Sequence, residues 1–593
     1  MAKKKEEGLK YLQVPLPAGQ KRGKMTKLSW SGINYRNTKD SGEISAELNI
    51  STISAPHLTP SEKRQTTVDL LSEYGNMSAN IKFNNDCRYY DMYAYDNTLV
   101  CCAIRDLKNG TFSDGTTPAD YYEYLYCVID SENKIIKTGR KTISAEATGE
   151  PGNKIQMFTS FQNYANIATI SNSKGLIFFP AKLSISFDDV VVVNKHFDET
   201  TDAGSRQTQV TAWLKDYGSR TAQMYFKCLA EHSDVSYGYN GPWIKYSGKG
   251  TGGKSSHWNS YTEYQMKEAN IANVPSLRHI CIAHQRLFGI SDSCVYASGY
   301  NDYANWNFDT ADEYSAENAW MSSVQSNNDG ENVGIVGYGG GVFVFKKDST
   351  YEITNTKNPF RIREVFKKGA LCQRAIQVVG SYLIFVSADA IMLYNGTTLK
   401  DIGYKLNADK FYSAVTGSDG RRLYLYCQTD KKEKNFFVYD TYTGIWAEED
   451  NAVEFEGFAK NNNGMFGIDK DFKLYKLDTG DYSHHWMTET DLSCNSTVDI
   501  KHINKVQMLA DIAPGSEICA YVLYDDEVFN KNTSHLIFKH KNEGTSSIKI
   551  PIRTVPRKTA NYGFKIHIEG YGYSKIYQME ILISEGGEKY VSG

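Results

Sequence analysis

The sequence predicts an all-β protein: a β-propeller of about seven blades (roughly six to eight) with an inserted loop subdomain, followed by an antiparallel β-sandwich. Three observations support this prediction. Almost no segment between about residues 80 and 480 has the 3.6-residue apolar spacing of a helix. A strand–turn–strand unit recurs through the same region. After Tyr482 the chain changes to six strand-like segments separated by glycine and proline.

The clearest repeats lie in the second half of the chain, where a β-rich run turns and continues as another β-rich run. Four such hairpins are predicted at residues 341–351, 382–394, 423–439 and 465–475. Their second strands carry tyrosines separated by 43, 45 and 36 residues, namely Tyr351, Tyr394, Tyr439 and Tyr475. Such a period is typical of propeller blades, and one hairpin alone is too small to be stable. An ordinary β-sandwich or several small β-domains is the alternative.

Weaker units of the same form lie upstream. They occupy residues 98–104 with 121–136, which we expect to form the first blade, and residues 175–187 and 286–298. Residues 200–275 interrupt the pattern, because they are rich in glycine, serine and threonine. Repeat proteins accept insertions at loops and often bind partners through them. We therefore expect residues 200–275 to project from one face of the body.

These patterns divide the chain into three parts. Residues 1–27 carry eight Lys/Arg against two Glu and are expected to form a basic N-terminal arm. The arm is either a solvated, mobile tail or a segment that docks on an acidic neighbour. Residues 28–482 are expected to form the propeller body, including the insertion, and residues 483–593 the C-terminal β-sandwich.

Composition limits the class of protein. The 593 residues are 41% hydrophobic, which is enough for packed cores in more than one domain. The formal net charge is −3, so the whole chain lacks the basic character of a nucleic-acid-binding protein. That charge remains compatible with DNA in transit, because a channel that lets DNA slide should not bind its phosphates tightly.

The cysteines and the hydrophobic segments indicate the compartment in which the chain folds. Eleven cysteines occur at irregular spacing without a Cys-x-x-Cys pair, which argues against a zinc ribbon and against a secreted disulfide framework. Reduced thiols in a cytosol are the expectation. The N-terminus lacks the apolar core of a signal peptide, and no run of about 18 apolar residues predicts a membrane span.

Three motifs suggest chemistry, and each has a simpler interpretation. Residues 248–255 match the phosphate-binding P-loop pattern, with Lys254 and Ser255 in the functional positions. A real P-loop requires a buried strand before it and a helix after it, and neither is predicted here. His484 and His485 are adjacent and would point to opposite faces of a strand, so we expect a surface pair at the domain junction and no metal site.

The third motif, Asp469 with Asp471, resembles the start of a calcium loop. These aspartates lie in a tight hairpin turn, where Asp is common, and the later carboxylates of a calcium loop are missing. The carboxylate boxes of propeller glycosidases are also absent from the sequence. The sequence therefore predicts no enzyme and no catalytic, cofactor-binding or metal-binding residue.

Several short segments resemble propeller-type tail and neck proteins of bacteriophages, and more distantly the tail nozzle (stabilisation) proteins of short-tailed phages. In chain order they are residues 30–34 (WSGIN), 42–43, 49–50, 56–60 (PHLTP), 295–298 (VYAS), 301–302, 305–306, 344–346, 351–353, 388–396 (ADAIMLYNG), 439–440 with 444–446, and 568–572 with Ile576 and Ile581. Ala390 replaces the glycine usual in the 388–396 hairpin. The resemblance covers most of residues 28–590, and its specificity comes from the order of the segments.

The resemblance implies a structural virion protein that forms a ring, commonly of six copies, below the portal-adaptor ring. Such a ring forms part of the DNA exit path and contacts the adaptor above it and tail tip or fibre proteins below it. Assembly would take place in the host cytoplasm. The propeller edges, the sandwich and the insertion with Trp213, Trp243 and Trp258 are the expected contact surfaces. A distal receptor-binding component that binds glycans, and a bacterial carbohydrate-binding propeller, are the alternatives.

Overall fold

The computed structural model describes residues 24–28, 30–36, 43–73, 87–95, 97–106, 121–144, 177–179, 184–186, 277, 279–300, 308, 318–324, 330–355, 357–491, 501–525, 527–554, 556 and 563–585. Regular structure in these residues is almost entirely β-strand, arranged in nine sheets. The helical pieces are the short α1 (Leu70–Glu73) and the 3-10 turns η1 (Thr52–Ser54), η6 (Gln373–Ala375) and η7 (Gly403–Leu406). No helix in the described part is long and apolar enough to cross a membrane.

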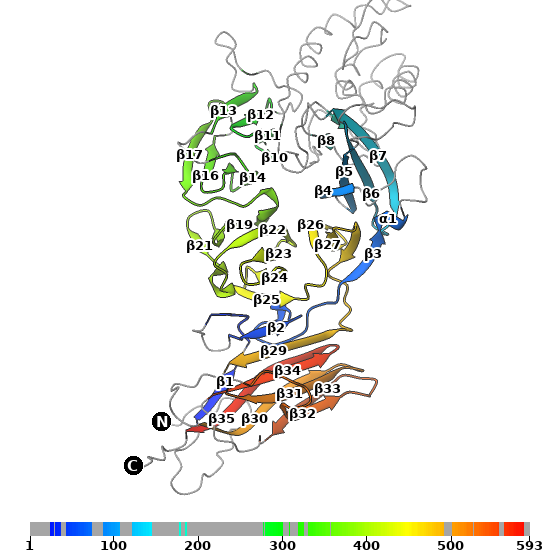
Figure 1. The fold of residues 1–593 in the computed structure, drawn as a ribbon, viewed down its shortest axis with the longest axis vertical. Helices are drawn as coiled ribbons and strands as arrows, with labels where there is room; N and C mark the ends of the chain where they lie inside the picture. The colour runs from blue at the N-terminus through cyan, green and yellow to red at the C-terminus, as the bar shows by residue number, and fades with distance from the viewer. Residues whose placement is uncertain are drawn as a thin grey trace, which may run out of the picture.

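In the described residues, six four-stranded antiparallel sheets belong to a β-propeller, and Figure 1 shows them following one another along an arc. Five of them use four consecutive strands. These are β4 (Cys87–Tyr95), β5 (Thr98–Asp106), β6 (Tyr121–Ile129) and β7 (Ile135–Ser144); β10 (His279–Ala283), β11 (Arg286–Ile290), β12 (Cys294–Ala297) and β13 (Trp320–Ser323); β14 (Gly334–Tyr338), β15 (Gly341–Phe345), β16 (Thr350–Thr354) and β17 (Arg361–Phe366); β18 (Ile376–Val379), β19 (Tyr382–Val386), β20 (Ile391–Tyr394) and β21 (Leu399–Asp401); β22 (Phe411–Ser418), β23 (Arg422–Thr429), β24 (Asn435–Asp440) and β25 (Ile445–Glu449).

The sixth sheet joins the two ends of the propeller. It consists of β26 (Phe455–Asn461), β27 (Gly464–Asp469) and β28 (Lys473–Lys476), with β3 (Gln65–Asp69) as its fourth strand. β3 runs antiparallel to β28, with Asp69 opposite Lys473 and Gln65 opposite Lys476. A strand from early in the chain therefore completes the last sheet.

Neighbouring sheets bury their apolar faces against one another. Phe343 and Phe345 of β15 pack with Leu383 and Phe385 of β19, and the rings of Phe345 and Phe385 lie 5.0 Å apart. Similar clusters link the β10 and β14 sheets, the β22 and β26 sheets, and the β26 and β4 sheets. The first strands of consecutive sheets also contact one another, from β10 through β14, β18, β22 and β26 to β4. These first strands are the inner strands of the propeller.

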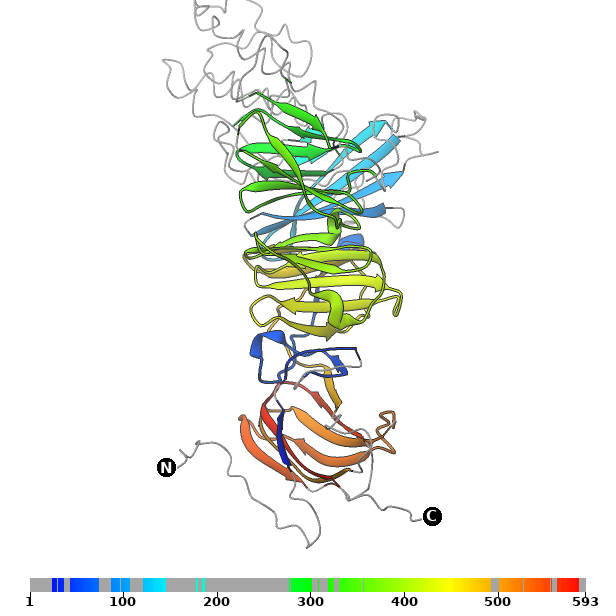
Figure 2. The ribbon, with the colours of Figure 1, turned by 90° about the vertical axis from the view of Figure 1, so that its left-hand side faces the viewer.

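Two further sheets follow in the C-terminal part and lie beyond one edge of the propeller (Figure 2). One has the order β1 (Lys24–Leu28), β35 (Ser574–Glu585), β30 (Lys501–Ile512) and β33 (Ile548–Thr554). The other has the order β2 (Ala46–Leu48), β29 (His485–Asp491), β34 (Phe564–Tyr571), β31 (Glu517–Tyr524) and β32 (His535–Lys541). Buried residues of both, such as Val506, Ile581, Val522 and Ile566, share one hydrophobic cluster.

The N-terminal segment differs from the expected domain division. Residues 28–62 were expected in the propeller body, and residues 1–27 as an arm. β1 instead pairs with β35, so that Lys24 lies opposite Ile583, and β2 pairs with β29 in the other C-terminal sheet. Residues 30–36 and 43–62, which we call the junction segment, lie between the propeller and the C-terminal sheets (Figures 1 and 2). Local propensity cannot reveal this, because it does not identify a strand's distant partner.

The predicted hairpins are confirmed. The four clear repeats form β15–β16, β19–β20, β23–β24 and β27–β28, which are the second and third strands of their sheets. The unit at 286–298 forms β11–β12, and the segments at 98–104 and 121–136 lie in one sheet. The unit at 175–187 contains the two-stranded pair β8 (Ile177–Phe179) and β9 (Ser184–Ser186). All six strands expected after Tyr482 are present. The insertion at 200–275 and residues 1–23 lie outside the described residues.

Candidate functional site

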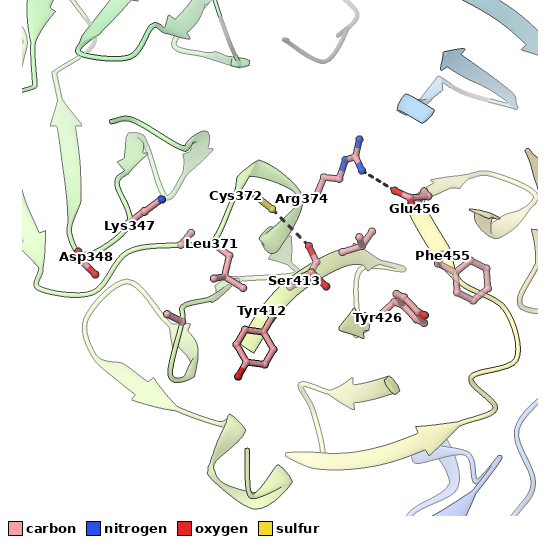
Figure 3. A pocket seen from close by; sticks show the side chains of 14 residues that line it. Lys347, Asp348, Leu371, Cys372, Arg374, Tyr412, Ser413, Tyr426, Phe455 and Glu456 are labelled. Atoms are coloured by element: carbon pink, nitrogen blue, oxygen red, sulfur yellow. Dashed lines mark hydrogen bonds and ion pairs between the residues drawn. The ribbon is translucent and has the colours of Figure 1, made fainter. Parts of the chain in front are cut away.

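The propeller contains a pocket of about 620 Å³ at the inner strands β22 and β26. The turn between β15 and β16, the connection from β17 to β18 and the turn after β19 complete its wall. Figure 3 shows the lining side chains, which come from four consecutive sheets. A volume of this size is typical of small-ligand sites, which commonly lie where several structural units meet.

Close backbone contacts hold the wall of the pocket in place. The connection from β17 to β18 passes the β15–β16 turn so closely that a Cβ at Gly369 would lie 1.9 Å from the carbonyl oxygen of Lys346. The N–H of Ala370 donates to that carbonyl at 3.0 Å, and the N–H of Leu371 donates to Val386 O at 2.9 Å. These hydrogen bonds fix the connection between two sheets and position Lys347 beside it.

An ion pair crosses one side of the pocket (Figure 3). Nη1 of Arg374 lies 3.1 Å from Oε2 of Glu456, and both side chains remain partly exposed. The guanidinium carbon of Arg374 also lies 4.6 Å from the ring centre of Tyr89 on β4. Thr416 Oγ1 donates to the backbone carbonyl of Arg374 at 2.7 Å. Arg374 is thereby held by contacts from three sheets.

Aromatic side chains line another side. Tyr412 on β22 is 59% exposed, while Phe455 on β26 is buried. Burial raises the pKa of Tyr426 to about 12, so its phenol keeps its proton near neutral pH. Burial also raises the pKa of the Cys372 thiol, which donates to Ala414 O at 3.7 Å. A thiol held protonated in this way is a poor nucleophile.

Charged side chains line two sides of the pocket. Lys347 and Asp348 on one side face a pocket that Arg374 and Glu456 close on the other. Glu456 forms an ion pair with Arg374, and burial raises the pKa of the Cys372 thiol. Among the residues that the structure describes, no three His, Cys, Asp or Glu side chains are grouped so that they could hold a metal ion.

None of the described motif residues weighed from the sequence lines this pocket. Lys254 and Ser255 are outside the described residues. His485 is the first residue of β29 and His484 immediately precedes it, and burial lowers the pKa of His484. His485 is exposed, with its Nε2 3.2 Å from Oε2 of Glu569. Each histidine therefore has a different environment.

The two aspartates form a turn, as expected. Oδ1 of Asp469 accepts the N–H groups of Asp471 at 2.9 Å and of Lys473 at 2.8 Å. Oδ2 of Asp469 accepts the hydroxyl of Tyr475 at 3.1 Å. These bonds use Asp469 to fix the β27–β28 hairpin, a common role of Asp in tight turns.

Sequence reasoning missed the pocket residues altogether. Asp348 and Glu456 are more than a hundred positions apart, and each belongs to an ordinary strand or turn of its own repeat. Tyr412 and Ser413 are both exposed near the start of β22, an inner strand that is otherwise largely buried, and form a local irregularity. A pocket assembled from successive repeats leaves no motif at a fixed spacing.

A second group of buried polar side chains fixes the junction segment to the propeller. Glu47 accepts the indole N–H of Trp30 at 3.0 Å and the backbone N–H of Glu448 at 3.0 Å. Burial raises the pKa of Glu47 well above its usual range. Next to it, Ser61 Oγ donates to Glu449 at 2.8 Å, and burial raises the pKa of Glu449 to about 7.

We expect stability to depend on pH through Glu449. The pKa of Glu449 is about 7 in the folded chain and about 4.5 for an unperturbed Glu, so between these pH values the folded chain holds a proton that the unfolded chain has released. Stability contributed by this group is therefore lost as pH rises from about 5 to 8, by up to about 3 kcal/mol. Urea denaturation at pH 5 and pH 8 should show a smaller loss for Glu449→Gln than for the wild type. The matched change at exposed Glu433 should preserve the wild-type difference, and an equal pH dependence in all three proteins would contradict the prediction.

Comparison with known protein families gives no match, and comparison with curated protein sequences gives none either.

Comparison with solved structures returns β-propeller proteins. The β-propeller domain of the Trilobed protease from Pyrococcus furiosus is 9% identical, with a TM-score of 0.31, covering 67% of this chain and 97% of that one. Pyrococcus horikoshii acylaminoacyl peptidase is 10% identical, with a TM-score of 0.30, covering 69% of this chain and 59% of the peptidase. A glycoside hydrolase family 43 arabinoxylan arabinofuranohydrolase from Bacillus subtilis is 9% identical, with a TM-score of 0.20, covering 87% of this chain and 98% of the hydrolase. At scores this low, none of these similarities carries an argument about activity.

Proposed function

We propose that this chain is a non-enzymatic structural protein of a bacteriophage tail or neck, assembled in the host cytoplasm as a ring of about six copies below the portal-adaptor. The ring would contribute to the DNA exit channel and would also contact tail tip or fibre proteins. DNA would be a non-specific partner in transit, because a net charge of −3 offers little attraction for phosphates. The proposal rests on the ordered sequence motifs and on one structural observation.

That observation is the meeting of motif segments that are far apart in the sequence. The N–H of Ile33, in the segment 30–34, donates to the carbonyl of Trp446, in the segment 444–446, at 3.1 Å. Asn49 N–H donates to Glu448 O at 2.9 Å, and Leu58 and Ile576 exchange two backbone hydrogen bonds. The motifs that carry the resemblance thus join the propeller to the C-terminal sheets, as expected if they preserve one module.

We also propose the finer architecture of this module. β8 and β9 come between β7 and β10 in the chain, where a seventh blade would fall. The two C-terminal sheets, with their shared apolar cluster, would form the β-sandwich. A closed propeller beside a sandwich presents rigid surfaces, and rings form when one such surface binds a different surface of the next copy.

Cryo-electron microscopy of virions that contain this chain tests the proposal. The expected result is a closed ring of density on the tail axis, with the N-terminal arm against its neighbour. Isolated copies at the tail periphery would contradict the ring and favour the receptor-binding alternative. Hydrolysis of ATP or of a glycan by the purified chain would contradict the non-enzymatic part.

A further inference from the structure

The charges that line the pocket balance one another. Two cations, Lys347 and Arg374, stand with two carboxylates, Asp348 and Glu456. A strongly anionic ligand would meet both carboxylates, and a strongly cationic ligand would meet both basic groups. Because both signs are present in equal number, the lining favours a ligand without net charge that offers both hydrogen-bond donors and acceptors.

The apolar part of the lining also restricts the ligand. Tyr412 presents a ring that is 59% exposed at the pocket, although large apolar side chains of the surrounding strands are mostly buried. Tyr426 and Ser413 contribute a phenol and a hydroxyl group to the same lining. A flat aromatic face bordered by polar groups suits a ligand that is apolar on one face and rich in hydroxyls at its edge.

Arg374 and Glu456 are already positioned before a ligand arrives. The 3.1 Å ion pair, the Tyr89 ring and the Thr416 hydrogen bond to the backbone hold Arg374 in one place. A guanidinium offers several donors in a plane, and the carboxylate beside it offers acceptors. Neighbouring hydroxyls of one sugar ring can therefore bind both groups, with little side-chain ordering needed on binding.

We propose that this pocket binds a neutral saccharide, stacked on Tyr412 and hydrogen-bonded to Arg374 and Glu456. A volume of about 620 Å³ suits a ligand of roughly two or three sugar units. The lining residues all belong to the propeller and none to the C-terminal sheets, and the site requires residues of a single chain. Saccharide binding is thus independent of ring formation, and each can fail without the other.

Isothermal titration calorimetry on the full chain tests this assignment. The probes are maltotriose, cellotriose, mannotriose and chitotriose, compared with an acidic hyaluronan tetrasaccharide and a pool of random tripeptides. At least one neutral trisaccharide should bind at one site per chain with a Kd of about 1 mM or tighter. Tyr412→Ala should weaken that binding about tenfold.

Two further variants distinguish binding in the pocket from nonspecific binding at the surface. One changes a tyrosine outside the pocket, and the other changes a second lining residue. Tyr442 is 77% exposed outside the pocket lining, so Tyr442→Ala should leave the affinity unchanged. Glu456→Gln should weaken binding while the thermal unfolding curve shows that the chain remains folded. The proposal is overturned if no neutral trisaccharide binds, if Tyr412→Ala and Tyr442→Ala have equal effects, or if the acidic saccharide or the peptides bind more tightly.

Discussion

Val68→Asp is expected to destabilise the propeller by at least about 3 kcal/mol, because it places an unpaired charge in a buried position. Val68 is 1% exposed in β3 and lies opposite Leu474 of β28. It belongs to a cluster with Leu70, Phe466 and Phe472 that links the β26 and β4 sheets. Loss of β3 would open the last sheet and expose the edge of β28, so urea denaturation should show a lower midpoint together with aggregation.

Thr66→Asp is the matched control for this variant. Thr66 lies in the same strand and is exposed, so the same new charge there should change stability by no more than about 0.5 kcal/mol. Equal stability of Val68→Asp and Thr66→Asp would show that β3 does not close the propeller. Measurement of both variants at one pH and salt concentration keeps the comparison independent of net charge.

Gly32→Ala is expected to loosen the junction segment from the propeller. Gly32 has a φ of 83°, and an added Cβ would lie 2.4 Å from Cγ2 of Ile445 and 2.7 Å from the carbonyl oxygen of Trp446. The strained φ and the steric overlap together should cost about 3 kcal/mol. The backbone hydrogen bond from Ile33 to Trp446 would have to shift, so its amide should exchange with solvent faster.

Gly480→Ala is the control that separates the cost of backbone strain from the cost of steric overlap with neighbouring atoms. Gly480 has a φ of 71°, and an added Cβ there would meet nothing within 4 Å. Its substitution should therefore cost only about 1 kcal/mol. A Gly32→Ala variant no less stable than Gly480→Ala in urea denaturation would show that the junction segment is not tightly packed on β25.

The repeated hairpins could be predicted from sequence because each is a local pattern. β15 (GVFVF) is buried along its whole length, and its turn to β16 is marked by polar residues. The outer strands of the same sheets were not predicted. β17 (RIREVF) has three charged and three apolar residues, all at exposed or half-exposed positions, and β21 has only three residues. Such edge strands lack an apolar run that a sequence could reveal.

Strand partners and the pocket could not be predicted for a related reason. β1, β2 and β3 pair with β35, β29 and β28, which are encoded roughly 400 to 560 residues later, and nothing in a strand's own sequence identifies its partner. The pocket depends on the same long-range geometry, since Arg374 and Glu456 meet only when the sheets are assembled. The local pattern of strand and turn specifies each repeat. The closure of the propeller and the pocket depend on packing between repeats.

The pairing of early with late strands has a consequence for synthesis on the ribosome. Five of the propeller sheets use consecutive strands and can form as these strands leave the ribosome. β1, in contrast, must wait until β35, more than 500 residues later, has been translated. At typical translation rates this wait lasts about half a minute to two minutes. β2 and β3 wait for β29 and β28, which are translated earlier than β35. Until its partner emerges each of these strands has unpaired edges, so chaperones that cover strand edges should associate with the nascent chain. A chain released before Ile583 would leave β1 without its full partner strand and would be a target for degradation.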